Sequence, residues 1–240
     1  MNKVYACSDL HGRLDLWEKI SAYCDESDKI YFLGDAIDRG PDGLKLMYKL
    51  LADKRVTYLK GNHEDMFVEF GTDMINIPHI SISLWYQNGG LPTIEAFEKL
   101  SFEAKESLIR KINALPYTAE YLNTNGLKIC MNHSGWIAPK KAFPLSKEQE
   151  LHNILWSRKH FHRPVEDGSI MVHGHTPVEY MHQFCKERPD NTYKIFKYDN
   201  NTKIDLDLSS AFTDIVALLD LDTLEPIYFS TLMEGETYVE

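Results

Sequence analysis

The sequence predicts a mixed α/β (α+β) fold, and three observations favour this class. Short apolar runs alternate with helical stretches over the first quarter of the chain. Two turn signals separate pairs of strand-like runs further along. Five of the apolar runs end in polar clusters, namely ACSDLHG, FLGDAIDRG, LKGNHE, CMNHSG and MVHGHTP. We therefore expect sheets whose strand ends build one site together.

The N-terminal quarter is expected to contain βαβ units. Its apolar runs are short and partly β-branched or aromatic, and each stops at a polar motif, as buried strands do: residues 4–7, 30–33 and 56–59. Between them, apolar residues recur at helical spacing over residues 14–24 and 44–51. This alternation of strand and helix predicts a parallel sheet.

The middle of the chain, residues 64–115, shows no comparable strand signal. Residues 93–100 and 103–114 have helical patterns, and Gly89 and Gly90 break the chain before them. We expect a helical insertion beside the site.

The C-terminal part is expected to form antiparallel strands. Turns at residues 123–126 and 199–201 each separate two strand-like runs, which is a hairpin signal. The strands expected here and just before are residues 117–122, 127–131, 170–172, 194–198 and 204–208. With no internal repeat, low-complexity tract or linker, residues 1–240 are expected to form a single domain.

The amino-acid composition argues against some classes of function. The chain is 43% hydrophobic and 26% charged, which is typical of a globular protein. Its formal net charge of -10 argues against stable nucleic-acid binding and against binding to anionic membranes, since both need a basic face. We therefore expect neither nucleic acid nor a membrane among its partners.

The cysteines indicate a reduced, cytoplasmic protein. Cys7, Cys24, Cys130 and Cys185 form no CxxC pair, and two of them lie in apolar runs. The N-terminus runs directly into a strand-like segment without an apolar leader, and no stretch approaches the roughly 18 apolar residues of a membrane span.

The polar clusters offer a mixed set of oxygen and nitrogen ligands and no thiolate. Carboxylate, imidazole and amide groups together suit manganese, iron or zinc better than a calcium cage. The candidate metal ligands are Asp9, His11, Asp35, Asn62, His133 and His175. We expect Asp9 and His11, two residues apart on an extended segment, to chelate one ion. Asp35 could bridge to a second ion, whose shell the other three would complete.

Two arginines are candidate phosphate ligands. Arg39 and Arg158 carry planar guanidinium groups whose donors match phosphate oxygens. The motif around Arg158 is the weaker one, because an arginine after a helix can also cap its C-terminus.

The motifs resemble those of the phosphoprotein phosphatase branch of the calcineurin-like metallophosphoesterases, over nearly the whole chain and in the same order. SDLHG corresponds to the family's GDxHG, GDAIDRG to GDxxDRG, KGNHE to RGNHE, NHSG to HAG, and HGHTP to the GHT block of bacterial members. The compact length is similar to the bacterial serine/threonine protein phosphatase type, including that of bacteriophage lambda. Ser8, Lys60 and the glycine-free segment IDLDLSSAF depart from the pattern without removing an expected ligand.

The resemblance implies a central β-sandwich flanked by helices, with the site at the loops on one edge. It implies that one metal ion is held by Asp9, His11 and Asp35, and the other by Asp35, Asn62, His133 and His175. It also assigns four further roles: His63 as general acid, Asp38 as the residue that orients it, and Arg39 and Arg158 as the phosphate clamp.

Three further histidines are interpreted differently. His175 fits the ligand block, whereas we expect a structural role for the neighbouring His173 and leave it out of the site. His160 and His162 form an HxH pair without other ligands nearby, which favours a solvated loop.

We therefore expect a dinuclear metal-dependent phosphoesterase, most similar to serine/threonine protein phosphatases, in which a hydroxide activated by two metal ions attacks phosphorus in line. Its cofactors would be two divalent or trivalent metal ions, with manganese favoured and iron or zinc as alternatives. Its substrate would be a phosphorylated protein or a small phosphoester. A diadenosine tetraphosphate hydrolase and an inactive phosphate-binding scaffold stay open as alternatives.

Overall fold

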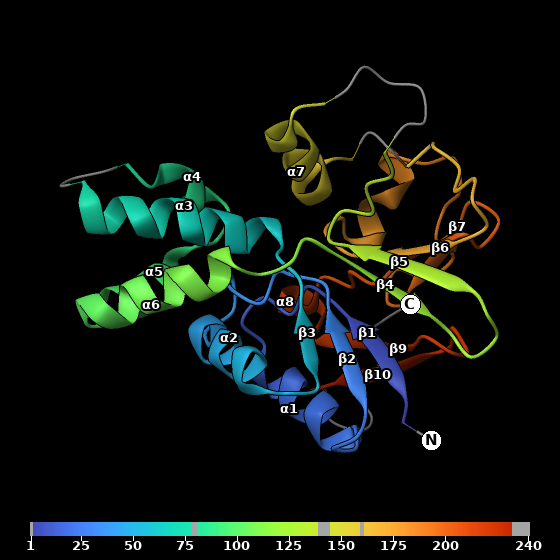
Figure 1. The fold of residues 1–240 in the computed structure, drawn as a ribbon, viewed down its shortest axis with the longest axis horizontal. Coiled ribbons are helices and arrows are strands. Elements are labelled where there is room, and N and C mark those ends of the chain that lie inside the picture. The colour runs from blue at the N-terminus through green and yellow to red at the C-terminus, as the bar shows by residue number, and fades with distance from the viewer. Residues whose placement is uncertain (1, 78–80, 139–144, 159–160, 232–240) are drawn as a thin grey trace.

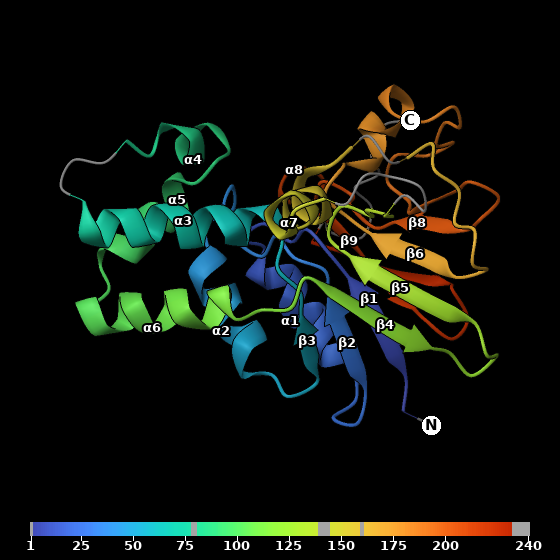
Figure 2. The same ribbon diagram turned by 45° about the horizontal axis from the view of Figure 1, so that its top comes forward.

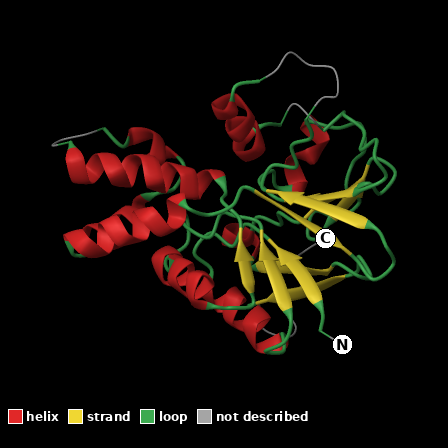
Figure 3. Cartoon of the chain, in the orientation of Figure 1, coloured by secondary structure: helices red, strands yellow, loops and turns green. Residues whose placement is uncertain are grey.

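The computed structural model describes residues 2–77, 81–138, 145–158 and 161–231. In these ranges the strands form two five-stranded sheets, and helices lie around them. Figure 3 shows the strands gathered on one side of the molecule and most of the helices on the other. The predicted mixed α/β class is confirmed.

The first sheet has the strand order β10-β9-β1-β2-β3. Its strands are β1 (Val4–Cys7), β2 (Lys29–Phe32), β3 (Val56–Tyr58), β9 (Ile215–Asp220) and β10 (Pro226–Ser230). The pairs β1–β2 and β2–β3 are parallel, as the βαβ pattern predicts. β9 and β10, which the sequence patterns did not reveal, extend the sheet by antiparallel pairing beside β1.

The second sheet has the order β4-β5-β6-β8-β7. Its strands are β4 (Thr118–Leu122), β5 (Lys128–Asn132), β6 (Ile170–His173), β7 (Phe196–Tyr198) and β8 (Lys203–Asp205). Both predicted hairpins are present, as the antiparallel pairs β4–β5 and β7–β8. The purely antiparallel arrangement is wrong, however, because β6 is parallel to both of its neighbours, β5 and β8.

The two sheets pack face to face as a sandwich (Figure 2). Side chains alternate between the two faces of a strand, and on β1 Val4 and Ala6 point into the space between the sheets. There they meet Ile129 and Met131 of β5 and Val172 of β6, all of them buried. This apolar layer holds the carboxyl ends of strands from both sheets in fixed relative positions.

Helices α1 (Leu14–Tyr23) and α2 (Gly43–Ala52) cover the outer face of the first sheet (Figure 1). In α1, Trp17 and Ile20 belong to the same buried cluster as Phe32 of β2, and the Trp17 and Phe32 rings meet edge to face at 6.4 Å. The apolar stripe predicted for this helix therefore faces the sheet.

A helical lobe extends from one end of the sandwich (Figure 1). It consists of α3 (Asn62–Asn76), α4 (Ser83–Gln87), α5 (Leu91–Glu98) and α6 (Phe102–Asn113). The helices predicted over residues 93–100 and 103–114 correspond to α5 and α6, whereas α3 and α4 carried no recognised signal. Because α3 begins at Asn62, inside the LKGNHE motif, the lobe is joined directly to the site.

The other helical elements are α7 (Lys147–Trp156), the 3-10 helix η1 (Val178–Gln183) and α8 (Ser210–Thr213). All four cysteines lie in the described ranges, and each is a free thiol. Within the described residues, no helix combines the length and apolar character needed to cross a membrane.

Candidate metal centre

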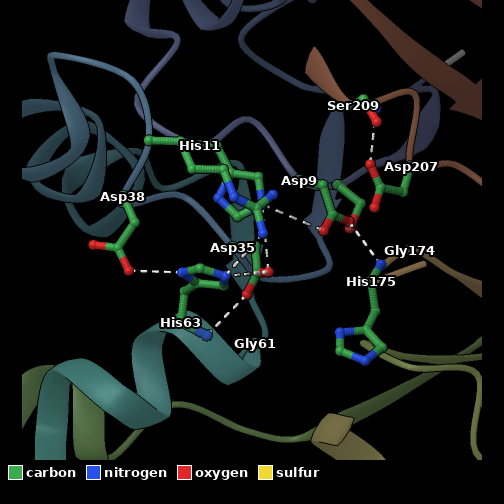
Figure 4. Close-up of polar contacts among 12 residues, drawn as sticks. Asp9, His11, Asp35, Asp38, Gly61, His63, Gly174, His175, Asp207 and Ser209 are labelled. Atoms are coloured by element: carbon green, nitrogen blue, oxygen red, sulfur yellow. Dashed lines mark hydrogen bonds and ion pairs between the residues drawn. The ribbon is translucent and has the colours of Figure 1, made fainter. Parts of the chain in front are cut away.

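The site lies where five strands end. The loops after β1, β2, β5 and β6 and the first turn of α3, which follows β3, bring their polar residues together (Figures 1 and 4). The carboxyl ends of parallel neighbours lie at one edge of a sheet, and the sandwich places both sheets' edges side by side. The residues brought together are Asp9, His11, Asp35, Asp38, Asn62, His63, His133 and His175.

The backbone of these loops is unusual. Asp9, His11, Asp35 and His175 have positive φ angles of 53°, 42°, 62° and 70°, in the left-handed region that non-glycine residues seldom adopt. The expectation that Asp9 and His11 lie on an extended segment is therefore wrong. β1 ends at Cys7, and the following turn rather than strand alternation directs both side chains inward.

Two glycines let the loops approach closely. A Cβ atom on Gly61 would overlap the Asp35 carboxylate, and one on Gly174 would overlap the Asp9 carboxylate. Either substitution would thus push a carboxylate out of the site.

Asp35 occupies the centre of the cluster. Its Oδ2 lies 3.5 Å from Nε2 of His11, and its Oδ1 lies 3.3 Å from Nε2 of His133. Its two oxygens thus face different histidines, as a carboxylate that bridges two metal ions requires. The backbone N–H of His63 also donates to Oδ1 at 3.1 Å, which fixes the carboxylate plane.

The side of the cluster near His133 gathers a second set of ligand atoms. Oδ1 of Asn62 lies 2.8 Å from Nε2 of His133 and 2.8 Å from Nδ1 of His175. Asp35, His133 and His175 offer ligand atoms within 4.8 Å of one another. These are the residues predicted for one of the two ions.

On the other side, Asp9 presents a free oxygen. Its Oδ2 accepts hydrogen bonds from Ser8 Oγ at 2.5 Å and from the His175 backbone N–H at 3.1 Å. Its Oδ1 is buried, lies 3.9 Å from Nε2 of His11 and has no hydrogen-bond partner among the described residues. A buried carboxylate oxygen without a donor is costly unless a cation compensates it.

The hydrogen bonds of His11 and His133 set their tautomers for metal binding. Nδ1 of His11 donates to the Ile37 carbonyl at 2.9 Å, and Nδ1 of His133 donates to the Leu33 carbonyl at 2.8 Å. Each ring therefore turns its Nε2 toward Asp35, and backbone carbonyls commonly orient metal-binding histidines in this way. The donor set and the free oxygen of Asp9 fit two hard or borderline cations.

His63 also lies close to this group, since His11, Asp35 and His63 offer ligand atoms within 4.8 Å of one another. Its Nδ1, however, lies 2.6 Å from Asp38 Oδ2, and its Nε2 is 3.8 Å from Asp35 Oδ2. A ring oriented by a carboxylate at Nδ1 with Nε2 facing the centre suits proton transfer. On the same side, Asp9 offers a buried carboxylate oxygen that has no hydrogen-bond donor among the described residues.

Both arginines reach the site. Arg39 Nη1 lies 2.6 Å from His11 Nε2, and its Nη2 lies 3.3 Å from His63 Nε2. Arg158 follows the C-cap of α7, and its Nη2 donates to the His175 carbonyl at 3.4 Å.

Burial and mutual charge shift the titration of these groups. Burial raises the pKa of Asp9, and the carboxylates of Asp207 and Asp35 raise it further. Burial also raises the pKa of Asp35, but the neighbouring histidines, His133 above all, outweigh it and leave that pKa well below its usual range. Burial lowers the pKa of His133, but Asp35 outweighs it and the pKa rises to about 10.

The remaining histidines lie outside the cluster or outside the described residues. His173 is buried with Nε2 2.8 Å from the Tyr198 hydroxyl, away from the ligands, in agreement with its expected structural role. His162 is exposed, and His160 lies outside the described residues.

Sequence reasoning missed Glu64, the last residue of the LKGNHE motif. Its buried carboxylate accepts the backbone N–H groups of Asp35, Ala36 and Gly61 and the Tyr58 hydroxyl, each at 2.8 Å. It thereby ties the loop that carries Asp35 to the start of α3. A glutamate three residues after the helix N-cap is a known capping signal, and that signal was available in the sequence.

Replacing Glu64 with glutamine should weaken both the fold and the metal site. An amide group would turn an NH₂ toward two of the four donors, so we expect a loss of about 3 kcal/mol in the free energy of unfolding. Metal affinity should fall by roughly 10- to 100-fold because the Asp35 loop loses its anchor. Urea unfolding and metal titration would measure both quantities.

Glu69→Gln, an exposed change on the same helix, is the matched control and should alter neither quantity. Unchanged stability in Glu64→Gln would show that its four hydrogen bonds contribute little.

Asp207 was also missed as a site residue. It comes from the IDLDLSSAF segment and lies beside Asp9 in Figure 4, with one oxygen accepting the Ser209 backbone N–H at 2.9 Å. Burial raises its pKa to about 6. Asp207 could not be recognised from the sequence for two reasons. It lies far along the chain from the expected ligands, and its motif departs from the expected pattern.

Comparison with known proteins agrees with this geometry. The family model for calcineurin-like phosphoesterases matches residues 2–208. Serine/threonine-protein phosphatase 1 of Salmonella typhimurium is 26% identical over 202 residues, covering 80% of this chain and 87% of that protein. A bis(5'-nucleosyl)-tetraphosphatase, PrpE, of Oceanobacillus iheyensis is 25% identical over 211 residues, covering 73% and 78%.

Among solved structures, a protein serine/threonine phosphatase from Saccharomyces cerevisiae superposes with a TM-score of 0.59 at 12% identity, covering 98% of this chain and 82% of that one. At that identity the likeness concerns the fold alone. The family match over most of the chain, together with the ligand cluster at the strand ends, shows that the protein belongs to the calcineurin-like phosphoesterase family and is a metallophosphoesterase.

Proposed function

We propose that the protein is a serine/threonine protein phosphatase that hydrolyses phosphomonoesters with two bound metal ions. One observation carries the proposal: the two oxygens of Asp35 face the Nε2 atoms of two different histidines, His11 and His133. Calcineurin-like phosphoesterases use a dinuclear metal site, and this arrangement suits one. We infer manganese as the native metal, with iron or zinc as alternatives.

The proposed ligands divide between the two sides of Asp35. Asp9 and His11 would hold one ion with it, and Asn62, His133 and His175 would hold the other. When bound, the ions would lower the pKa of water and neutralise charge on the phosphoryl oxygens. The guanidinium groups of Arg39 and Arg158 would bind the remaining phosphate oxygens.

His63 would complete the reaction by proton donation. As the bond between phosphorus and the leaving oxygen breaks, that oxygen keeps the electron pair and takes the proton from Nε2 of His63. Asp38, bonded to Nδ1 at 2.6 Å, would hold the ring so that Nε2 faces the centre. This step matters most for leaving groups such as the alkoxide of serine, which are poor without a proton.

A dinucleoside polyphosphate hydrolase is the second candidate. It is favoured by PrpE, whose identity of 25% is close to that of the Salmonella phosphatase. Such an enzyme would use the same ligands and differ in the group that leaves. The helical lobe beside the site would then select the substrate.

A substrate panel tests the proposal. The manganese-loaded protein would be offered phosphoserine and phosphothreonine peptides, a phosphotyrosine peptide, diadenosine tetraphosphate and 4-nitrophenyl phosphate. We expect the phosphoserine and phosphothreonine peptides to be hydrolysed with the highest kcat/KM, and chelation to abolish the activity. Preferential cleavage of diadenosine tetraphosphate would establish the second candidate, and no hydrolysis with metal bound would point to an inactive scaffold.

A further inference from the structure

The helical lobe contacts the carboxylate that orients the proton donor. Nε1 of Trp85, on α4, donates to Oδ2 of Asp38 at 2.9 Å, and the same oxygen lies 2.6 Å from Nδ1 of His63. Asp38 and Trp85 are both 0% exposed, and Asp38 Oδ1 has no hydrogen-bond partner among the described residues. The indole therefore supplies one of the few donors that hold this carboxylate.

Packing fixes the direction of the indole N–H. The Trp85 ring stacks on Phe70 of α3, with centroids 6.2 Å apart and an interplanar angle of 17°, and meets Phe67 edge to face at 6.0 Å. A Cβ atom on Gly90 would overlap the indole, so the chain passes directly over its edge. A ring enclosed in this way cannot turn its N–H away from Asp38.

The segment that follows Trp85 also forms hydrogen bonds with the backbone of Asp38 and Arg39, which form a turn. The Asp38 N–H donates to Thr93 Oγ1 at 3.0 Å, and the Arg39 N–H donates to the Gly89 carbonyl at 2.8 Å. Asp38 and Arg39 have φ angles of 70° and 64°, a conformation that non-glycine residues keep only when surrounding contacts impose it. Three hydrogen bonds between residues 85–93 and the Asp38–Arg39 turn therefore maintain this strained backbone at the site.

We propose that Trp85 is a positioning residue for proton donation, acting through Asp38 on His63. Because the indole N–H and the imidazole Nδ1 share one carboxylate oxygen, loss of the N–H frees the carboxylate to rotate, and the ring it orients loses its alignment with the leaving group. The lobe would thus contribute to catalysis as well as to substrate selection. This inference rests on the proposed function of His63.

Trp85→Phe tests the inference because it removes the N–H and keeps an aromatic ring. Turnover of a phosphoserine peptide should fall about tenfold, a part of the 10²- to 10⁴-fold contribution typical of general acids. Turnover of 4-nitrophenyl phosphate, whose leaving group needs no proton, should change less than about twofold. KM for both substrates and the manganese content should stay at wild-type values.

Trp17→Phe is the matched control: it makes the same change at a buried tryptophan of α1 and should alter neither turnover. If Trp85→Phe fails to fold, the isostere in which sulfur replaces the indole N–H can be incorporated at position 85 instead, with the same expected result.

A double-mutant cycle distinguishes failure of the positioning role of Trp85 from failure of the proposed proton donor, His63. In a His63→Asn background, Trp85→Phe should have no further effect, because the two residues act in one chain of contacts. Equal slowing of both substrates by Trp85→Phe, or an additive effect in the cycle, would overturn the positioning role. Equal slowing of both substrates by His63→Asn alone would instead refute the proposed proton donor.

Discussion

Asp35→Asn should leave the protein folded but deprive it of bound metal and of activity. In the proposed site, a neutral amide with one oxygen would bridge two ions far less well than a carboxylate whose two oxygens face His11 and His133. We expect kcat/KM to fall on the order of 10³-fold or more, since bound metal ions typically contribute several kcal/mol of transition-state stabilisation. Metal analysis of the purified protein should find clearly fewer than two ions per chain.

Asp42→Asn serves as the control, because Asp42 pairs with exposed Lys45 at 2.6 Å and has no part in the site. It should keep both metal content and activity. Retention of two ions by Asp35→Asn would mean that Asp35 does not bridge, and the division of ligands proposed here would be wrong.

His63→Asn should also lose turnover, but unlike Asp35→Asn it should retain its metal ions. Asparagine preserves polarity, but its amide N–H is far too weak an acid to protonate the leaving group, so kcat for a phosphoserine peptide should fall by about 10² to 10⁴. The loss should be much smaller for 4-nitrophenyl phosphate, because its leaving group departs without a proton. Steady-state kinetics with both substrates, together with metal analysis, would measure the effect.

Exposed His162 provides the control variant, His162→Asn, which should behave as wild type. Loss of metal from His63→Asn would reassign His63 as a ligand, a possibility that its place near His11 and Asp35 raises. Full activity of the His63→Asn variant would show that His63 takes no part in the mechanism.

Much of the fold could be predicted from local patterns. The strands that carry the site are short apolar runs that stop at polar motifs, and the parallel order of β1, β2 and β3 follows from the helices between them. The pairing of β6 could not be predicted in this way. Its partners, β5 and β8, lie far from it in sequence, and the two hairpin turns are local signals that do not specify β6's neighbours.

Local sequence patterns also fail to predict the backbone conformation at the site. An extended segment through Asp9 and His11 was the simplest expectation after a strand, yet both residues have positive φ. Hydrogen bonds from the N–H groups of Asp9 and His11 to the carbonyls of Gly34 and Asp35 hold that turn. These partners come from another loop, so no pattern within residues 8–12 could reveal the conformation.

The sequence by itself determined the chemistry: which side chains can bind metal or phosphate, and that they follow strands. Only the tertiary structure decided how those groups are held. Glu64 bonds three backbone N–H groups around Asp35, and Trp85 reaches Asp38 from a helix whose sequence carries no catalytic motif. The physical reason is that residue type decides what a side chain can bind, whereas its orientation depends on packing and hydrogen bonds between segments distant in the chain.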